Sequence, residues 1–440
     1  MNKLNQTKTV EAKAAQFVRH DAPFAPADTS KYSPKNSQLV EGPWRAQPEV
    51  LLSVHDDLAS LAAIWTLLEQ TGDCTAFQTY AFVSTWFAHV GRAEGVTPCV
   101  VVGWDAEDAG EGKGPLFIMP LALTHGALGT KLSWLAGNVS DYKGPLLAKD
   151  FALRVRPGQF KGLWKQIRET LPEHDIVELT SMPEKIGGQA NPFMQLGSMT
   201  QHASSAHMTR ISNGWDAYYD AKRSSGSKKR DRQKRRKLEE FGETVLVTPT
   251  DTATIAETVE MLIAQKSVSF ARMGVANIFD KPGMRDFYMA LATDAAANGL
   301  IEVSRLEVGG KVAATNWGVS FKGRFHYVLT SYDEQQTELA KRGPGMIQLM
   351  ELMKRAADTG HTEFDFTVGD EGYKADWCEI ETVLYDHIEA ATVRGFLIRL
   401  PRTTFLKVKR FIKQTPVLWQ AYTRMRAAAG GFPGGNAARA

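Results

Sequence analysis

Hydrophobic and polar positions in the second half of the chain follow a regular order of strand-like and helix-like patterns. A strand-like run at 243–249 precedes two stretches in which apolar residues recur at helical spacing, at 252–265 and 283–298. Three strand-like runs follow within 300–331, separated by two glycine-containing turns of two residues each. The pattern therefore predicts a strand, two helices and an antiparallel meander of three strands.

One more helix and strand complete this half. After the loop KRGPG at 341–345, apolar residues recur at helical spacing up to Ala357, and Gly360 ends the pattern. A strand-like run at 363–367 follows at once, so we expect the helix to cross over to a parallel neighbouring strand. A last strand is expected at 381–390.

The first half of the chain repeats this order of elements. Its strand-like and helical runs lie, in chain order, at 50–56, 58–69, 80–90, 98–104, 115–123, 131–137, 160–170 and 175–181. We infer two copies of one αβ unit of roughly 160 residues each, a usual domain size. The predicted fold class is α/β, with a mixed sheet in each of two tandem domains.

The chain is expected to contain an N-terminal domain at 46–210, a C-terminal domain at 211–395 and a basic helical tail at 396–426. Residues 1–45 are polar with scattered prolines, and residues 427–440 are rich in Gly and Ala, so both ends are expected to be disordered. No apolar run reaches the roughly 18 residues that a membrane span needs, and the start lacks the apolar stretch of a secretory signal. A cytoplasmic location is expected.

Charge is segregated along the 440 residues, although the net charge is only +3. Ten Lys and Arg stand against one acid at 222–237, and ten stand against none at 390–440. Removing these two runs from the totals of 52 basic and 49 acidic residues leaves 32 and 48, a net charge near −16. Basic runs of this kind attract anions such as phosphates, nucleic acid or lipid headgroups.

The order of elements resembles the fold of the GNAT superfamily of acyltransferases, and its tandem repetition resembles the FemAB-like peptidyltransferases. At the residue level the chain is similar to the CelD-like family associated with cellulose biosynthesis, which shares the BioF2-like acetyltransferase domain. The matching stretches are KRRKLEEFG, GPGMIQLMELMKRAADTG and FDFTVGDEGYKADW in the second half, and AFQTYAFVSTWF, FIMPLAL and DYKGPL in the first. The resemblance covers residues 48–425. It implies transfer of an acyl group from a thioester, or in the FemAB branch of an aminoacyl group from tRNA, to an amine or hydroxyl.

The loop before the helix that ends near Ala357 is a candidate phosphate site. Helix N-termini leave backbone N–H groups unpaired, and glycine lets the backbone approach a ligand closely. Two glycines fit the GNAT loop Arg/Gln-x-x-Gly-x-Gly/Ala, whereas Ala340 stands in the Arg/Gln place and Pro344 removes one N–H. The predicted donor-binding residues are Lys341, Arg342, Gly343, Gly345 and Met346. A plain Gly-Pro turn that caps the helix is the alternative.

The stretch FDFTVGDEGYKADW supplies the candidate catalytic residues. Strand alternation sends its two phenylalanines to one face and Asp365 to the other. The resemblance places the acyl donor beside the preceding strand, so Asp365 becomes the candidate general base. Tyr373 is expected to protonate the leaving thiolate and Lys374 to neutralise charge, with Glu371 beside them. In the alternative, Asp365 holds the turn, Glu371 opens a short helix and Lys374 forms a surface ion pair.

The basic run at 222–237 is expected to form a helix that ends at Gly242. Arginines can clamp the phosphates of a carrier, a nucleotide-linked sugar or tRNA. The predicted anion-binding residues are Arg230, Arg232, Arg235 and Arg236. A solvated charged face is the alternative.

The tail carries Phe405, Val408, Phe411 and Ile412 on one helical face and lysines on the other. This pattern suits either a helix lying on a membrane surface or one docked on the protein's own core.

Several familiar chemistries lack their motifs. The sequence has no His-Glu-x-x-His, Cys-x-x-Cys, Gly-x-Ser-x-Gly or P-loop, and Cys74, Cys99 and Cys378 have no metal-ligand spacing. We expect buried thiols, no metal site and no permanently bound cofactor.

The expected function is direct acyl transfer from acyl-CoA or acyl carrier protein to a small-molecule or saccharide acceptor, in cellulose or exopolysaccharide production. The alternatives are FemAB-like aminoacyl transfer from tRNA and a non-catalytic assembly factor.

Overall fold

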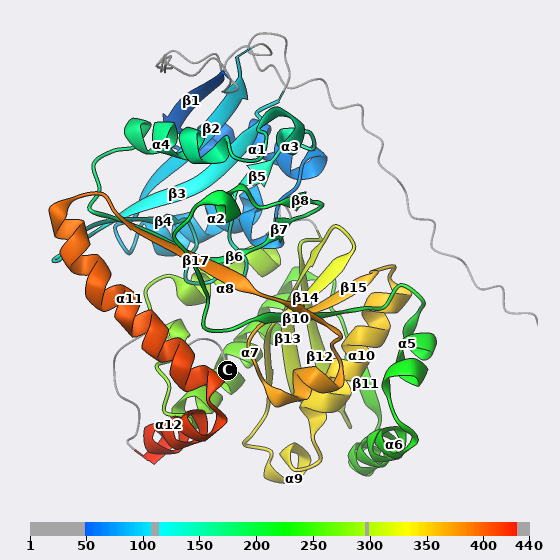
Figure 1. Cartoon of the computed structure of the whole chain (residues 1–440). Coiled ribbons are helices and arrows are strands. Elements are labelled where there is room, and N and C mark those ends of the chain that lie inside the picture. Colours follow the sequence, from blue (N-terminus) through cyan, green and yellow to red (C-terminus); the bar gives the residue numbers. More distant parts are fainter. Residues whose placement is uncertain (1–48, 107–113, 295–298, 429–440) are drawn as a thin grey trace, which may run out of the picture.

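The computed structural model describes residues 49–106, 114–294 and 299–428 and contains two mixed sheets, each flanked by helices (Figure 1). The prediction for residues 1–45 lies outside these ranges, as does that for 427–440 apart from the last two residues of a helix. No helix in the described ranges is long and apolar enough to cross a membrane.

The N-terminal sheet has the order β1-β2-β3-β4-β6-β17-β9, and β5 pairs with β3. Its strands are β1 (Val50–His55), β2 (Thr97–Asp105), β3 (Phe117–Gly126), β4 (Gly129–Trp134), β5 (Leu146–Leu147), β6 (Ile176–Pro183), β9 (Met199–Gln201) and β17 (Leu384–Ala390). The helices of this half are α1 (Ala62–Thr71), α2 (Tyr80–Trp86), α3 (Phe151–Arg154) and α4 (Phe160–Thr170), and a small hairpin joins β7 (Lys185–Ile186) and β8 (Gln189–Ala190).

The C-terminal sheet has the order β11-β12-β13-β14-β15-β10-β16. Its strands are β10 (Ala206–Arg210), β11 (Thr244–Val247), β12 (Ile301–Val308), β13 (Lys311–Phe321), β14 (Arg324–Tyr332), β15 (Glu363–Val368) and β16 (Ile380–Thr382). The helices are α5 (Trp215–Lys222), α6 (Ser225–Glu239), α7 (Thr252–Arg272), α8 (Met284–Thr293), α9 (Thr337–Ala340) and α10 (Pro344–Asp358), followed after the sheet by α11 (Val393–Gln414) and α12 (Pro416–Ala428).

The predicted fold class is confirmed, because each half has a mixed sheet with one parallel pair. The crossover helices α4 and α10 connect β4 to β6 and β14 to β15, and both strand pairs are parallel. The structure differs in detail: α7 runs seven residues beyond the predicted 252–265, and the predicted last strand is broken into β16 and β17.

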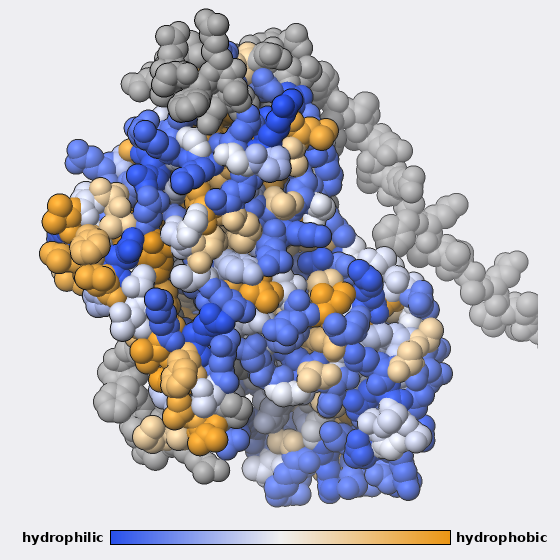
Figure 2. All heavy atoms as spheres, viewed as in Figure 1, coloured by the Kyte–Doolittle hydropathy of each residue, from blue (hydrophilic) through white to orange (hydrophobic). Residues whose placement is uncertain are grey.

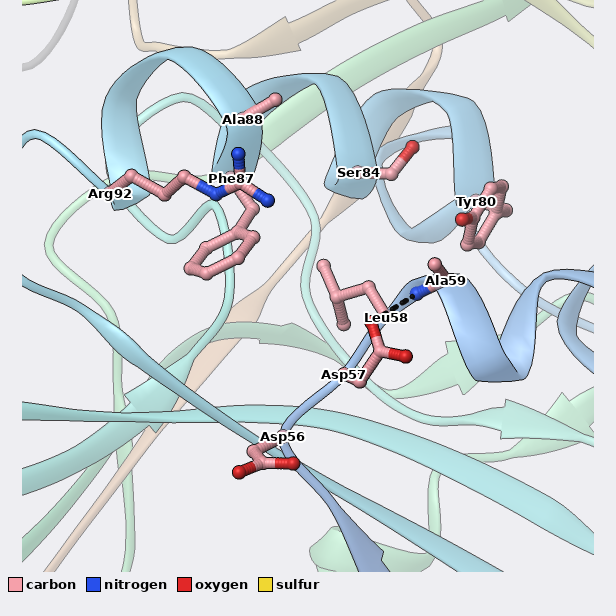
Figure 3. Close-up of a pocket in the computed structure, with 9 residues that line it drawn as sticks. All are labelled: Asp56, Asp57, Leu58, Ala59, Tyr80, Ser84, Phe87, Ala88 and Arg92. Atoms are coloured by element: carbon pink, nitrogen blue, oxygen red, sulfur yellow. Dashed lines mark hydrogen bonds between the residues drawn. The ribbon is translucent and has the colours of Figure 1, made fainter.

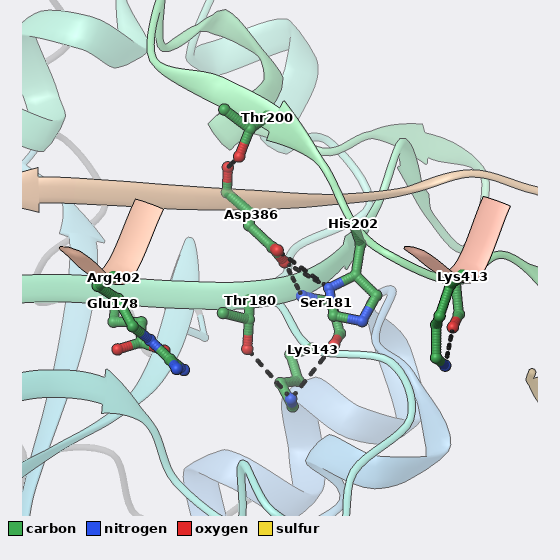
Figure 4. Close-up of polar contacts among 10 residues, drawn as sticks. Lys143, Glu178, Thr180, Ser181, Thr200, His202, Asp386, Arg402 and Lys413 are labelled. Carbon is green, nitrogen blue, oxygen red and sulfur yellow. Dashed lines mark hydrogen bonds and ion pairs between the residues drawn. The ribbon is translucent and has the colours of Figure 1, made fainter. Parts of the chain in front are cut away.

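Each sheet contains one strand from the other half of the chain. β10 precedes the second unit in the expected order yet pairs with β15, and β17 follows that unit yet pairs with β6 in the N-terminal sheet (Figure 1). In Figure 4, Asp386 of β17 accepts a hydrogen bond from the backbone N–H of Ser181 at 2.9 Å and contacts His202 at 2.8 Å. The two sheets therefore do not separate at the boundary expected between residues 210 and 211, and the division into domains stays a prediction.

A shared irregularity relates the two halves. The pairing register shifts between β17 and β6 and between β10 and β15. In each pair the strand that follows the crossover helix, β6 or β15, contains a residue with positive φ. These residues are Ser181 (φ 57°) and Thr367 (φ 59°), and a β-branched residue is rarely found there. The residue two positions before Ser181 is Leu179, and the residue two positions before Thr367 is Asp365. The repeated bulge supports the inference of two copies, of which only the second carries a carboxylate.

One hydrophobic core spans both halves. Phe82 of α2 packs edge-on against Phe287 of α8 at 5.4 Å between ring centroids, and Phe77 packs against His326 of β14 at 5.7 Å. The N-terminal half thus closes directly over the strand that neighbours β15.

Candidate functional site

The pairing of β14 with β15 ends early. Parallel pairs join Arg324 to Glu363, Phe325 to Phe364 and His326 to Asp365, and the ladder stops there although both strands continue. On its other side β15 stays paired with β10. Beyond the pair of His326 and Asp365, the two parallel strands are therefore no longer paired with each other.

Asp365 lies at this point with its side chain fully buried. Its Oδ1 accepts hydrogen bonds from the Tyr142 hydroxyl at 2.7 Å and from the backbone N–H of Thr367 at 2.8 Å. Its Oδ2 lies 3.6 Å from Nη1 of Arg324 and 3.9 Å from Nε2 of His326, and has no hydrogen-bond partner among the described residues. The carboxylate therefore sits at the contact between the two halves.

The neighbours of Asp365 have shifted pKa values. Burial, together with the charge of Asp365, raises the pKa of the Tyr142 hydroxyl well above its ordinary value. Burial lowers the pKa of His326, although the charge of Asp365 acts in the opposite direction. Burial also disfavours the charged form of Arg324, but the carboxylates of Asp365 and Glu363 outweigh it and raise its pKa. At neutral pH the site thus holds a neutral phenol, a neutral imidazole and a paired guanidinium.

Tyr142 is a neighbour of Asp365 that sequence reasoning did not single out. It belongs to DYKGPL, a stretch matched for its resemblance but given no role, and it lies 223 positions from Asp365. The side-chain amide of Gln78 donates a hydrogen bond to the backbone carbonyl of Tyr142 at 2.9 Å. The neighbouring Lys143 donates to the hydroxyls of Thr180 and Ser181 at 3.4 Å (Figure 4). The N-terminal half therefore fixes the segment that covers Asp365.

Lys374 and Glu371 form an ion pair in the loop after β15, in which the lysine is buried and the carboxylate is half-buried. The Lys374 ammonium lies 2.8 Å from the Glu371 carboxylate and donates to the carbonyls of Thr367 at 3.3 Å and Gly369 at 3.2 Å. Lys374 is only 3% exposed, so its ammonium is held by two backbone carbonyls and one carboxylate. The pair holds the loop just after the strained Thr367.

Tyr373 lies in the same loop and packs on Phe366, with 6.2 Å between ring centroids. Burial raises the pKa of its hydroxyl, so that Tyr373 stays protonated at neutral pH. This raised pKa makes the hydroxyl a weak acid, and Tyr373 packs on the face of β15 opposite to Asp365, so the structure does not bring the two predicted catalytic residues together.

The loop at the start of α10 has the backbone that a close ligand approach needs. Gly343 has φ 74° and caps the helix, and Pro344 is its first residue. A Cβ on Gly345 would touch only Tyr332, at 3.7 Å, and Met346 is half-buried. Space is therefore left beside Gly345 at the N-terminus of this helix.

Basic side chains surround this loop. A Cβ on Gly343 would have Cδ of Lys234, from α6, as its nearest neighbour at 4.0 Å. Arg342 lies over the Phe241 ring at 5.9 Å, whereas Lys341 is exposed and paired with Glu338 at 2.7 Å. The structure thus brings the basic run and the predicted phosphate loop together.

Two buried amides under α10 lack partners. Both amide atoms of Asn316 and the Nε2 of Gln348 have no hydrogen-bond partner in the part of the chain that the structure describes, and both side chains are fully buried. The Oε1 of Gln348 accepts from Thr330 at 3.2 Å. Buried polar groups are nearly always paired, so these amides need a further partner.

The basic run forms α6, as predicted, although the helix ends at Glu239 rather than at Gly242. Asp231, the single acid of the run at 222–237, is buried and receives two hydrogen bonds of 3.0 Å from Arg223. This pair anchors the helix to the rest of the domain.

The four predicted anion-binding arginines differ in their surroundings. Arg235 is paired with Glu351 of α10, and Arg230 donates to Ser227 at 2.9 Å. Arg232 and Arg236 are exposed and form no ion pair within the described ranges. The last two are thus the ones open to an anion.

The cysteine nearest this site is not a nucleophile at neutral pH. Burial raises the pKa of the Cys378 thiol to about 12, and Cys74 and Cys99 are buried with pKa values of about 12 for the same reason. Among the residues that the structure describes, no group of three or more His, Cys, Asp or Glu side chains could hold a metal ion.

Two open hollows lie on the N-terminal half, away from these residues. The first, of about 450 Å³, appears in Figure 3, where Asp57 faces the backbone of Ala59 and the helix carrying Tyr80, Ser84 and Arg92 forms the far wall. The second, of about 370 Å³, is lined by residues that include Leu67, Asp105 and Lys149. Neither includes a predicted site residue.

Comparison with protein families gives one match, in the C-terminal half. Residues 225–375 match the family model described as acetyltransferase (GNAT) domain. This GNAT domain includes α6, the loop before α10, Asp365 and Lys374, and it indicates an acyltransferase that uses an acyl-CoA co-substrate. The comparison with curated proteins gives no match.

Solved structures similar to this chain include that of FemX, at 10% identity and a TM-score of 0.51, covering 77% of this chain and 97% of that one. This similarity supports the fold over the 77% of the chain that it covers. A conserved protein of unknown function from Bacteroides thetaiotaomicron VPI-5482 is similar at 11% identity and a TM-score of 0.49, covering 77% and 99%. A tandem GNAT protein from the clavulanic acid biosynthesis pathway is similar at 12% identity and a TM-score of 0.38, covering 78% and 99%.

Proposed function

We propose that the protein transfers an acyl group from a thioester of coenzyme A or acyl carrier protein to an amine or hydroxyl acceptor. One observation carries the proposal: the β14–β15 ladder ends beside the buried carboxylate of Asp365, inside the GNAT domain. An opening between parallel strands admits an extended ligand without breaking backbone hydrogen bonds.

The donor phosphates would lie at the N-terminus of α10. Gly343, Gly345 and Met346 would present backbone, and Lys341, Arg342 and Lys234 would add positive charge. The unpaired amides of Asn316 and Gln348 suit a donor whose arm carries amide groups of its own.

The acceptor would take the place that the Tyr142 hydroxyl occupies. A hydroxyl donating to a carboxylate at 2.7 Å has the geometry that general-base catalysis needs. The acceptor N or O would attack the thioester carbonyl while its proton passes to Asp365. The C–S bond would then break, and the departing thiolate would take that proton from Asp365, because Tyr373 packs on Phe366, on the opposite face of β15.

Lys374 and Glu371 would act as positioning residues, since they hold the loop that carries Tyr373. Positioning of both reactants and backbone N–H groups aimed at the carbonyl oxygen would supply much of the rate.

A binding screen tests the proposal. A ligand that prefers the native state raises its stability, so acetyl-CoA, longer acyl-CoAs or acyl carrier protein should raise the melting temperature. Lys234→Gln should weaken binding of the effective thioester, whereas Lys229→Gln, an exposed lysine near the start of the same helix, should not. No shift with any thioester would sink the proposal.

Aminoacyl transfer from tRNA is the second candidate, because α6 presents exposed cations without ion pairs in the described part of the chain. These are Lys229, Arg230, Arg232, Lys234, Arg236 and Lys237. The tRNA affinity should then fall steeply with added salt. A saccharide acceptor and a place in cellulose or exopolysaccharide production are proposals that rest on the sequence resemblance alone.

A further inference from the structure

The helix α11 docks on the N-terminal sheet with its polar side inward. Arg402 donates from Nε to Glu178 at 3.0 Å, and Lys413 donates to Ser204 at 2.8 Å (Figure 4). Arg410 donates to the side chain of Gln201. A Cβ on Gly395 would lie 1.7 Å from the carbonyl oxygen of Asp175, so the helix backbone rests directly on this half. Basic and small residues thus make much of the contact with the protein, together with Ile398, whose Cδ1 would lie 3.1 Å from a Cβ on Gly129.

The apolar side of α11 points away from the protein. Val393 is 83% exposed, Leu397 66% and Phe411 64%, and α12 adds Val417 and Met425 at 76% and 64%. The other exposed apolar side chains of the two helices are Phe396, Leu400, Phe405, Val408, Leu418 and Tyr422. Figure 2 shows hydrophobic residues gathered on the left edge, over α11, and below it over α12. A surface helix normally turns its apolar stripe to the core, so this orientation is inverted and the stripe needs another partner.

The charge around the stripe indicates which partner covers it. Residues 390–440 contain ten Lys and Arg and no acid, and three of the ten, Arg402, Arg410 and Lys413, are bonded to the N-terminal half. Lys407 is exposed one turn before Phe411, on the same face, and Arg394 is exposed at the start of the helix. In a symmetric dimer through this surface the same basic helix would meet itself, which like charges oppose. An anionic lipid surface matches both the apolar stripe and the positive charge.

We propose that α11 and α12 seat the protein on an anionic lipid bilayer, with the stripe of α11 lying in the interface. The 22 residues of α11 give a contact about 33 Å long. Because no described helix can cross a membrane, the contact is peripheral.

Flotation of the full chain with vesicles tests this inference. We expect binding to phosphatidylcholine vesicles that contain phosphatidylglycerol, and much weaker binding to phosphatidylcholine alone. Leu397→Gln/Phe411→Gln should reduce partitioning at least tenfold, since two buried apolar side chains are lost. Lys407→Gln should reduce it about fivefold at low salt.

The matched control is Leu153→Gln/Val245→Gln, which removes two exposed apolar side chains far from the tail and should bind as the unchanged protein does. Circular dichroism checks that each variant is folded. Absence of binding to anionic vesicles overturns the proposal, as does binding that the Leu397 and Phe411 changes leave intact. A dimer that these changes dissociate, without any vesicle binding, would assign the stripe to a second copy and would also overturn it.

Discussion

The contact between Asp365 and Tyr142 joins the proposed base to the half of the chain that closes over it. A buried carboxylate that accepts two hydrogen bonds and faces a guanidinium is suited to stability as well as to catalysis. The structural and catalytic roles of Asp365 can be separated because its two oxygens have different neighbours. Oδ1 accepts the hydrogen bonds from Tyr142 and Thr367, whereas Oδ2 faces Arg324.

Replacing Asp365 with Asn should abolish most turnover. The amide keeps an oxygen for Tyr142 and Thr367, but it cannot take a proton and it turns an NH2 group toward Arg324. We expect turnover to fall by about 100-fold or more, and the free energy of unfolding to fall by about 1–3 kcal/mol. Thiol release from the effective thioester and urea denaturation measure the two effects.

Tyr142→Phe is the control for that change. It removes the same hydrogen bond and leaves the carboxylate, so stability should fall by a similar amount while turnover persists. An equal loss of turnover in Asp365→Asn and Tyr142→Phe would show that the contact between Asp365 and Tyr142 has a structural role and that Asp365 is not the base.

His326 should make the protein less stable in mild acid. Burial holds its pKa in the folded state below the ordinary 6.5, so below pH 6.5 the unfolded chain binds a proton that the folded one does not. Stability should therefore fall as pH drops from about 7 to 5.5, with a slope of up to about 1.4 kcal/mol per pH unit. Urea denaturation across this range should show a shallower slope for His326→Gln than for the unchanged protein. An identical slope would contradict the assignment.

At the scale of elements, the loop after β15 depends on one buried ammonium. Lys374→Met would leave the Glu371 carboxylate and two carbonyls without their donor. We expect a loss of about 3–5 kcal/mol in the free energy of unfolding. Lys341→Met breaks an exposed ion pair with the same change of residue type and should cost less than about 1 kcal/mol. Comparable losses would show that the loop does not depend on Lys374.

Hydrophobic periodicity predicted most elements of both halves, because strands and helices are local patterns. It placed α4 at its observed bounds and the crossover from β14 through α10 to β15 in the observed order. It could not assign β10 and β17 to their sheets, since a short strand carries no mark of the edge it will pair with. It singled out Asp365 but not its partner, because the Tyr142 contact depends on how the two halves pack.

On the scale of the whole molecule, the exchanged strands make each sheet depend on the other half. Without β17, β6 would lose its neighbour and the N-terminal sheet would end in an open edge. The shared core adds to this dependence, since α2 packs on α8. Although tandem domains often unfold separately, this connectivity favours cooperative unfolding of the entire chain.

We therefore expect one unfolding transition, with tryptophan fluorescence and far-ultraviolet circular dichroism coincident in urea. A chain ended after Thr382 keeps every strand of the C-terminal sheet but lacks β17, and it should fail to show a cooperative transition. A chain ended after Thr415 lacks only α12 and the residues beyond it, and should retain that transition. Two separate transitions in the intact protein, or native-like unfolding of the chain ended after Thr382, would show that the halves fold independently despite the exchange.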